Sequence, residues 1–297
     1  MDADAAAARE RRLGLALGVA AYASWGVVPL FWRLLRTVAP VEILAHRAAW
    51  GLGAFLALAA VTGQLSGVGR ALRDPRQRWV LAGSGLLLAG NWGLFIWATL
   101  SGHLVAASLG YFINPLVSVA LGVVFLGERL GRLTQAAIAL AALGVGWLTV
   151  GHGVPWIALA LAGSFGAYGL IRKVVAVPAV VGSTVETVLM APAAVAYLGY
   201  LASRGGGALG HVDGATHALL VATGVVTAVP LVWFTGAARR LPLSTVGLLQ
   251  YLAPTGQLIT AVLVFHEPLS ARRLLAFGLI WAALALFSIE LWRGRRR

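Results

Sequence analysis

The sequence predicts an all-α integral membrane protein with ten transmembrane helices, arranged as two inverted five-helix repeats. Three observations lead to this prediction: the composition, the spacing of apolar runs and an internal repeat. Hydrophobic residues make up 60 % of the 297 positions and charged residues 11 %, and the mean hydropathy is +0.86. Such a composition lies outside the range of ordinary soluble domains and is typical of membrane proteins.

Ten apolar runs approach the length of about 20 residues that a helix needs to cross the hydrocarbon core. No alternating strand pattern occurs, and lipid offers backbone groups no outside partner, so helices are the expected spanning elements. The first run has no small-residue cleavage site and is expected to be retained. The runs cover residues 14–32, 41–61, 79–100, 104–126, 133–150, 155–171, 180–201, 215–237, 243–265 and 274–292.

An internal repeat relates the two halves of the chain. Residues 108–130 align without a gap with residues 247–269, so that Pro115 meets Pro254 and Glu128 meets Glu267. Because five spans is an odd number, the second half is expected to enter the membrane from the opposite side, as in many secondary transporters. The chain then divides into an N-terminal tail (1–12), two five-helix repeats (13–151 and 152–292) and a basic C-terminal tail (293–297).

Charge and cysteine content exclude several classes of protein. The net charge is +13, but the arginines lie in short loops between apolar runs rather than on one face of a soluble domain, so no nucleic-acid partner is expected. Most of these basic residues fall on one side if both termini are cytoplasmic, as the positive-inside rule requires. With no Cys and no ligand-like spacing of His, no metal and no cofactor are expected.

Both copies of the repeat carry a narrow polar seam on one helix face. The first seam contains Tyr111, Asn114 and Ser118, and the second contains Gln250 and Gln257. Residues three, four and seven apart share a helix face, so we expect these side chains to face a transported molecule.

The proline and the glutamate of each copy are expected to have structural roles. Pro115 and Pro254 are expected to bend their helices. Glu128 and Glu267 are expected to cap the helix that follows each of them, although contact with substrate or a proton is an alternative.

Three charged or titratable residues interrupt apolar runs, which is costly unless they face a cavity or a partner. They are His46, Arg47 and Glu186, and His46 aligns with Glu186 in the repeat. We expect them to approach a common cavity, with Glu186 as a proton-linked or cation-recognising carboxylate. The alternative is that each reaches the nearby membrane interface by snorkelling.

Aromatic and amide side chains are the other candidates for a binding pocket. Tyr22, Trp25, Asn91, Trp92 and Trp233 resemble the lining of a site for an organic solute. Plain packing of the indoles is the alternative.

The chain resembles the RarD branch of the EamA transporters, within the drug/metabolite transporter superfamily. The resemblance is carried by SLGYFINPLVSVALGVVFLGERL (108–130), SFGAYGLIRK (164–173) and LLQYLAPTGQLITAVLVFHEPLS (248–270). It implies a central cavity made by spans one to four and six to nine, with spans five and ten at the back, and a bacterial inner membrane location. Ala253 stands where the first repeat has Asn114, so a polar role there would be one-sided.

These observations favour a secondary active transporter, or permease, that moves a small organic solute or drug-like metabolite by alternating access. Proton coupling is a separate hypothesis. The expected partners are this solute and membrane lipids, and Gly- and Ala-rich faces in the fifth and tenth spans would also allow a homodimer. An integral membrane enzyme acting on lipid-linked substrates would need clustered acidic or His residues, which are absent. A non-transporting scaffold is the third alternative.

Overall fold

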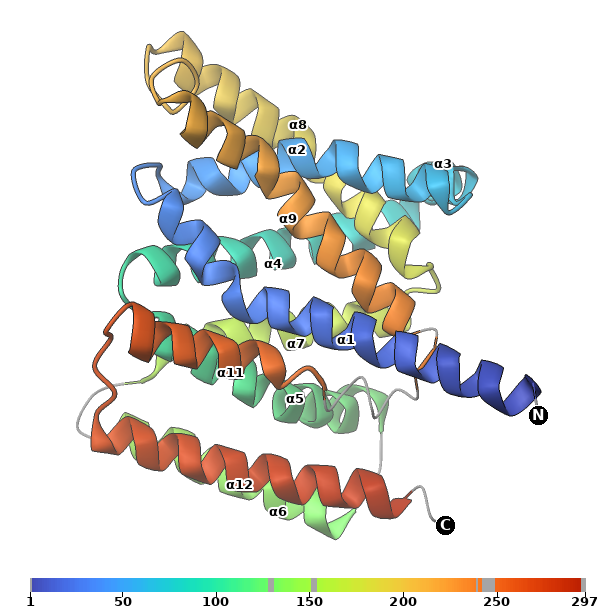
Figure 1. Cartoon of the computed structure of the whole chain (residues 1–297), viewed down its shortest axis with the longest axis vertical. Helices are drawn as coiled ribbons and strands as arrows, with labels where there is room; N and C mark the ends of the chain where they lie inside the picture. The colour runs from blue at the N-terminus through green and yellow to red at the C-terminus, as the bar shows by residue number, and fades with distance from the viewer. Residues whose placement is uncertain (1, 128–130, 151–153, 239, 242–248, 295–297) are drawn as a thin grey trace.

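The computed structural model describes residues 2–127, 131–150, 154–238, 240–241 and 249–294. All regular structure in these ranges is helical, as the sequence predicts (Figure 1). The helices are α1 (Asp2–Leu34), α2 (Pro40–Val61), α3 (Leu65–Arg73), α4 (Pro75–Leu100), α5 (Leu104–Leu126), α6 (Arg132–Thr149), α7 (Trp156–Val174), α8 (Ala179–Ser203), α9 (Gly214–Ala238), α11 (Leu252–Ile259), the π-helical turn η1 (Thr260–Val264) and α12 (Ala271–Gly294).

Eight of these described helices are long and apolar enough to cross a membrane. Two further apolar helices, Trp156–Arg172 and Leu252–Val264, are shorter. The ninth predicted run does not appear as one helix in its described part, because residues 250 and 251 form a turn before α11 begins.

One short helix lies in a segment that the sequence analysis treated as a loop. In α3, Val68 and Ala71 are buried against Val180 and Val181 of α8. Arg70 and Arg73 lie in its last turn, where positive charge favours the helix dipole. It is an amphipathic helix with too few apolar residues to span a bilayer.

Aspartate side chains cap the first turns of α4 and α9. The Asp74 carboxylate accepts hydrogen bonds from the backbone N–H groups of Arg76 and Gln77, and caps α4. At the start of α9, Asp213 accepts from the Thr216 backbone N–H at 2.8 Å and from its hydroxyl at 3.0 Å. These bonds hold the pKa of the Asp213 carboxyl below its ordinary value, because they stabilise its charged form.

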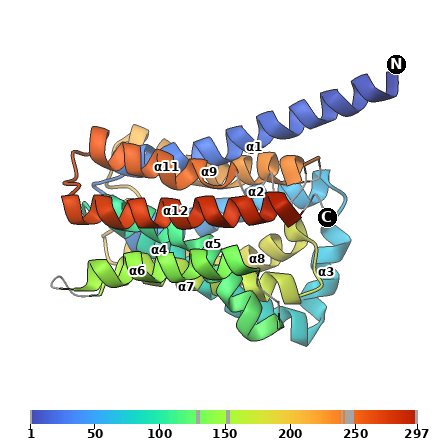
Figure 2. The same cartoon turned by 90° about the horizontal axis from the view of Figure 1, so that it is seen from below.

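The main helix pairs are unchanged when the two halves are exchanged, with α7, α8, α9, α11 and α12 taking the places of α1, α2, α4, α5 and α6. Thus α1 packs on α9 as α7 packs on α4, and α1 packs on α11 as α7 packs on α5. Likewise α2 packs on α9 as α8 packs on α4. Finally α2 pairs with α8, and α6 pairs with α12 along one edge of the bundle (Figures 1 and 2). The remaining helices enclose the polar side chains described next.

Candidate functional site

Arg47 of α2 is held among aromatic side chains from two other helices. Its guanidinium carbon lies 3.5 Å from the ring centroid of Trp92 on α4 and 5.7 Å from that of Trp32 on α1. Its Nε donates a hydrogen bond to Thr227 Oγ1 on α9, at 2.9 Å. A cation above an indole face is attracted by the ring quadrupole, so these contacts fix the guanidinium in one orientation.

Asn91, one residue before Trp92, is 1 % exposed and joins three helices. Its Nδ2 donates to the Leu161 carbonyl at 3.0 Å and to Ser164 Oγ at 2.9 Å, both on α7. Its Oδ1 accepts from the Tyr111 hydroxyl on α5 at 3.0 Å. Because both kinds of amide atom are used, the Asn91 side chain is locked, and it holds the Tyr111 hydroxyl in place.

A row of rings leads from this group towards Glu186. The Tyr111 ring centroid lies 5.5 Å from that of Phe95 and 6.2 Å from that of Phe165, and Phe165 lies 5.8 Å from Tyr168. The Tyr168 hydroxyl donates to Glu186 Oε2 at 3.3 Å. Edge-to-face and tilted contacts of this kind are favourable ring geometries, so the row is a packed connection between two polar groups.

Glu186 of α8 lies at the other end of this row and is 3 % exposed. Its Oε1 accepts from Ser84 Oγ of α4 at 2.5 Å, and Arg172 Nη1 of α7 lies 3.7 Å from the same oxygen. The carboxylate therefore faces partners within the bundle. Arg172, which the sequence analysis counted among loop residues, is the cation that accompanies it.

The structure does not bring His46 and Glu186 into one cavity. His46 is 2 % exposed, and its nearest carboxylate is that of Glu42, 4.0 Å away and one helical turn earlier. Neither His46 ring nitrogen has a hydrogen-bond partner. The expectation of a shared His46–Glu186 site is therefore not met.

The direction of the two helices explains this separation. On α2 and α8, Ala45 packs near Ala194 and Leu198, whereas Thr184 lies beside the Phe55 carbonyl. The two helices thus run antiparallel, and equivalent positions of the repeat lie on opposite sides of their crossing point. Sequence alignment alone could not reveal where this crossing point falls.

A third group of predicted residues packs between α1, α9 and α11. Tyr22 and Trp25 of α1 lie with ring centroids 5.3 Å apart, and Phe234 of α9 lies 6.0 Å from each. Gln257 Nε2 donates to the Trp25 carbonyl at 3.3 Å, while its buried Oε1 has no partner. Gln257 therefore links α11 to α1 by a hydrogen bond, and its side-chain oxygen remains as a polar group without a partner.

The other predicted seam and lining residues are placed less uniformly. Asn114 is partly buried and its Oδ1 has no hydrogen-bond partner, whereas Ser118, one turn later on α5, is exposed. Ser118 lies on the same helix face as Tyr111, but the described residues leave it exposed. Trp233 and Gln250 are partly buried.

The expected helix bends differ between the two copies. Pro115 lies inside α5, which is continuous from Leu104 to Leu126. Pro254 instead lies in the first turn of α11, where the missing N–H costs no helical hydrogen bond. The break in the second copy thus precedes the proline.

Glu267 caps a helix, but a different one from that expected. Its Oε1 accepts from the Leu104 backbone N–H at 2.8 Å and its Oε2 from that of Val105 at 2.9 Å. Both N–H groups belong to the first turn of α5, in the other half of the chain, whereas the helix that follows Glu267 is α12. Glu128 lies outside the described residues.

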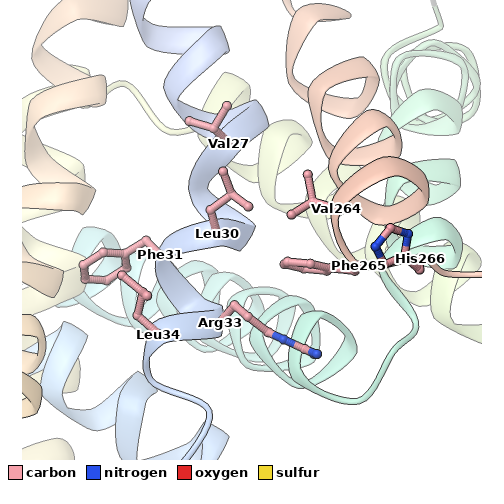
Figure 3. Close-up of a pocket in the computed structure, with 8 residues that line it drawn as sticks. All are labelled: Val27, Leu30, Phe31, Arg33, Leu34, Val264, Phe265 and His266. Atoms are coloured by element: carbon pink, nitrogen blue, oxygen red, sulfur yellow. The ribbon is translucent and has the colours of Figure 1, made fainter.

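A groove of about 660 Å³ is lined by none of the polar side chains described above (Figure 3). It is lined by the end of α1, with Leu30, Phe31 and Arg33, and by Phe265 and His266 after η1. Helices α1 and α11 touch at Gly26 and Gly256, where an added Cβ on Gly256 would lie 2.9 Å from Gly26 Cα. The groove forms where they separate beyond this contact. A second cavity of about 350 Å³ lies between α4 and α7 and reaches Asn91 and Ser164.

Several residues at the site escaped the sequence analysis. Thr227, Ser84 and Arg172 supply hydrogen bonds or charge to Arg47 and Glu186. Ser and Thr are common in membrane helices, where they also bond to the preceding turn, so their residue type alone carries no signal.

Comparison with known proteins agrees with this architecture. Residues 12–150 match the EamA-like transporter family. Protein RarD of Streptomyces exfoliatus is 46 % identical, over 98 % of this chain and 93 % of that protein. An uncharacterized transporter of Vibrio cholerae is 43 % identical, over 95 % of this chain and 94 % of its own length.

The chain belongs to the EamA-like transporter family. Its similarity to several proteins named RarD, including that of Escherichia coli at 42 % identity over 98 % of both chains, assigns it to the RarD branch. A solved crystal structure with 21 % identity has a TM-score of 0.60 and covers 93 % of this chain and 97 % of the other, which shows a shared fold. As a family member whose described residues include eight long apolar helices, it is a multi-pass membrane protein of the drug/metabolite transporter superfamily.

Proposed function

We propose that this chain is a secondary active transporter that moves a small organic solute across the bacterial inner membrane by alternating access. The observation that carries the proposal is a set of buried and partly buried polar side chains between helices of both halves. Arg47 of α2 binds Thr227 of α9, and Asn91 of α4 binds Ser164 of α7 and Tyr111 of α5. Polar groups are costly in a membrane interior and mark solute pathways in transporters.

The exchange symmetry of the helix contacts supports a mechanism in which two inverted five-helix repeats rock against each other. In such transporters the binding site lies near the middle of the bilayer, at the interface of the repeats. The pairs α4–α7 and α1–α9 each join one helix from the first half to one from the second. Both termini are proposed to lie in the cytoplasm.

The names of the relatives favour transport over the alternative of an enzyme acting on lipid-linked substrates. The relatives from V. cholerae and Pseudomonas aeruginosa carry the name uncharacterized transporter. The described carboxylates whose contacts are known also have partners that account for them, as set out below.

Solute exchange in proteoliposomes tests the proposal. Vesicles containing the purified protein would be loaded with a bacterial metabolite extract, and the solutes that leave would be identified by mass spectrometry. Protein-dependent release of at least one small organic solute is expected. If no solute leaves faster than from protein-free vesicles, the transport proposal is wrong.

Proton coupling through Glu186 is a separate part of the proposal. Its carboxylate is buried with Arg172, so that loss or gain of a proton would change the pairing of the two groups. We expect Glu186→Gln to abolish the response of flux to an imposed pH gradient, whereas Glu10→Gln, at the exposed Glu10–Arg240 ion pair, keeps it. Unchanged flux and pH response in Glu186→Gln would remove Glu186 from the mechanism.

A further inference from the structure

Arg47 is a partly buried cation between helices of the bundle, and it has no counter-ion among the described residues. Its neighbours are Trp92, Trp32, Thr227 and Tyr111, none of which is a carboxylate. No described carboxylate lies within 4 Å of its guanidinium. Charges that are removed from water normally acquire a partner of opposite sign, because the desolvation cost is otherwise not offset.

Other interactions already account for the described carboxylates whose contacts are known. Some of them cap helices and one binds a loop, and the others pair with arginines elsewhere. Asp74 and Asp213 cap α4 and α9, and Glu267 and Glu290 accept from the first turns of α5 and α6. Glu42 accepts from the Ala208 N–H. Glu10 pairs with Arg240, and Glu186 pairs with Arg172.

The two interior arginines differ in this respect. Arg172 has Glu186 at 3.7 Å, so that positive and negative charge accompany each other. Arg47 has only aromatic faces and hydroxyl groups. With Nε committed to Thr227, its two Nη groups are the donors that remain for a ligand.

We propose that Arg47 binds the oxyanion of the transported molecule, so that the substrate class is organic anions carrying a carboxylate or a phosphate. The planar guanidinium presents its donors in a fork that matches these groups, and Trp92 and Thr227 hold the fork in place. The substrate then supplies the negative charge that the protein interior lacks. This inference rests on the proposed transport function and names the substrate class of the same site.

Matched probes that differ in charge test the inference on the full-length protein in detergent. Phenylacetate and phenyl phosphate supply the two oxyanions, whereas phenylacetamide is neutral and phenethylamine is positive. A ligand that binds the native state raises Tm. We expect at least one anion to raise Tm in a concentration-dependent manner, and the amide and the amine to leave it unchanged; which anion acts distinguishes carboxylate from phosphate recognition.

Variants of Arg47 link this shift to the guanidinium. Arg47→Gln should abolish the anion-induced shift, and Arg47→Lys, which keeps the charge without the fork, should weaken apparent affinity about tenfold or more. The matched control is Arg78→Gln, since Arg78 also lies over an indole, 5.9 Å from the centroid of Trp79, but at the start of α4. The control should respond to the anions as the wild type does.

The stability of the ligand-free variants gives a readout that does not depend on the choice of probe. An uncompensated cation does not stabilise the empty protein, so Arg47→Gln should keep or raise Tm without ligand. A marked fall in the Tm of both Arg47→Gln and Arg47→Lys would show a structural role and overturn the proposal. It would also be overturned if no anion raised the wild-type Tm, or if the amine raised it equally.

Transport and anion binding can fail separately. Anion-dependent stabilisation without flux in proteoliposomes would retain the anion site and reject transport. Flux of a neutral or cationic solute that Arg47→Gln leaves unchanged would retain transport and reject the anion site.

Discussion

Glu267 offers the most direct test of how the two halves are held together. Its carboxylate accepts two hydrogen bonds, of 2.8 and 2.9 Å, from the first-turn N–H groups of α5, and it is 7 % exposed. Hydrogen bonds to a charged group contribute about 1.5–3 kcal/mol each. The positive end of the helix dipole adds about 0.3–1 kcal/mol for a carboxylate at this position.

The substitution Glu267→Gln keeps the shape of the side chain but replaces one acceptor oxygen by a donor. That NH₂ group would face a backbone N–H of Leu104 or Val105, so one bond is lost and one buried donor is left without a partner. We expect a loss of about 2–3 kcal/mol in the free energy of unfolding for Glu267→Gln, and about 3–5 kcal/mol for Glu267→Ala, which loses both bonds.

Unfolding by SDS titration of the purified protein in mixed micelles measures this loss. Glu10→Gln is the control, because the Glu10–Arg240 ion pair is exposed and such pairs contribute about 0–1 kcal/mol. If Glu267→Gln were no less stable than Glu10→Gln, the carboxylate would not be holding α5, and the reasoning from its two bonds would be refuted.

Three further predictions concern packing, the amide network and a helix cap. Gly256→Ala should destabilise the protein by about 1–3 kcal/mol in the same SDS titration, because the added Cβ would lie 2.9 Å from the backbone of Gly26. Gly278→Ala is the control: its Cβ would have no neighbour within 4 Å, so this variant should be neutral or stabilising. Equal stability of the two variants would contradict the close contact of α1 and α11. Asn91→Leu should lower solute flux in proteoliposomes at least tenfold, since the Tyr111 hydroxyl loses its acceptor and Ser164 loses the bond that it accepts from Asn91. Wild-type flux would exclude the amide from the site. Asp213→Asn should lower Tm at neutral pH. The pKa of Asp213 is lower in the folded state than in the unfolded state, so the Tm difference between variant and wild type should be complete above the unfolded-state pKa. It should vanish as the pH falls through the folded-state pKa. A difference that did not change with pH would contradict the cap.

Much of the fold could be predicted from the sequence because its determinants are local. The run 104–126 coincides with α5, and the run 41–61 differs from α2 by one residue. Apolar length, a proline at the first helical position and a capping Asp all act within one or two turns. By contrast, α3 was missed because its nine residues carry only a short apolar face.

The site could be predicted only in part. Periodicity places Arg47, Asn91 and Tyr111 on polar or interrupted faces, and the structure brings them into one group. Sequence periodicity does not predict that Thr227 binds Arg47 or that Ser84 and Arg172 bind Glu186. It also does not predict that Ser118 is exposed. Each of these depends on which helix lies opposite, and that neighbour is more than 70 residues away in the chain for Arg47 and for the Ser84–Glu186 pair.

The sequence by itself therefore determined a membrane protein, the extents of most of its helices and a family. Hydrophobic length and helix-end chemistry act over a few residues, and the family motifs can be read directly. Only the tertiary structure decided that Glu267 caps α5, that His46 and Glu186 lie apart and that Arg47 has no described counter-ion. These facts depend on how helices cross and which faces meet, because a helical repeat defines the direction of a side chain but not the partner that it will contact.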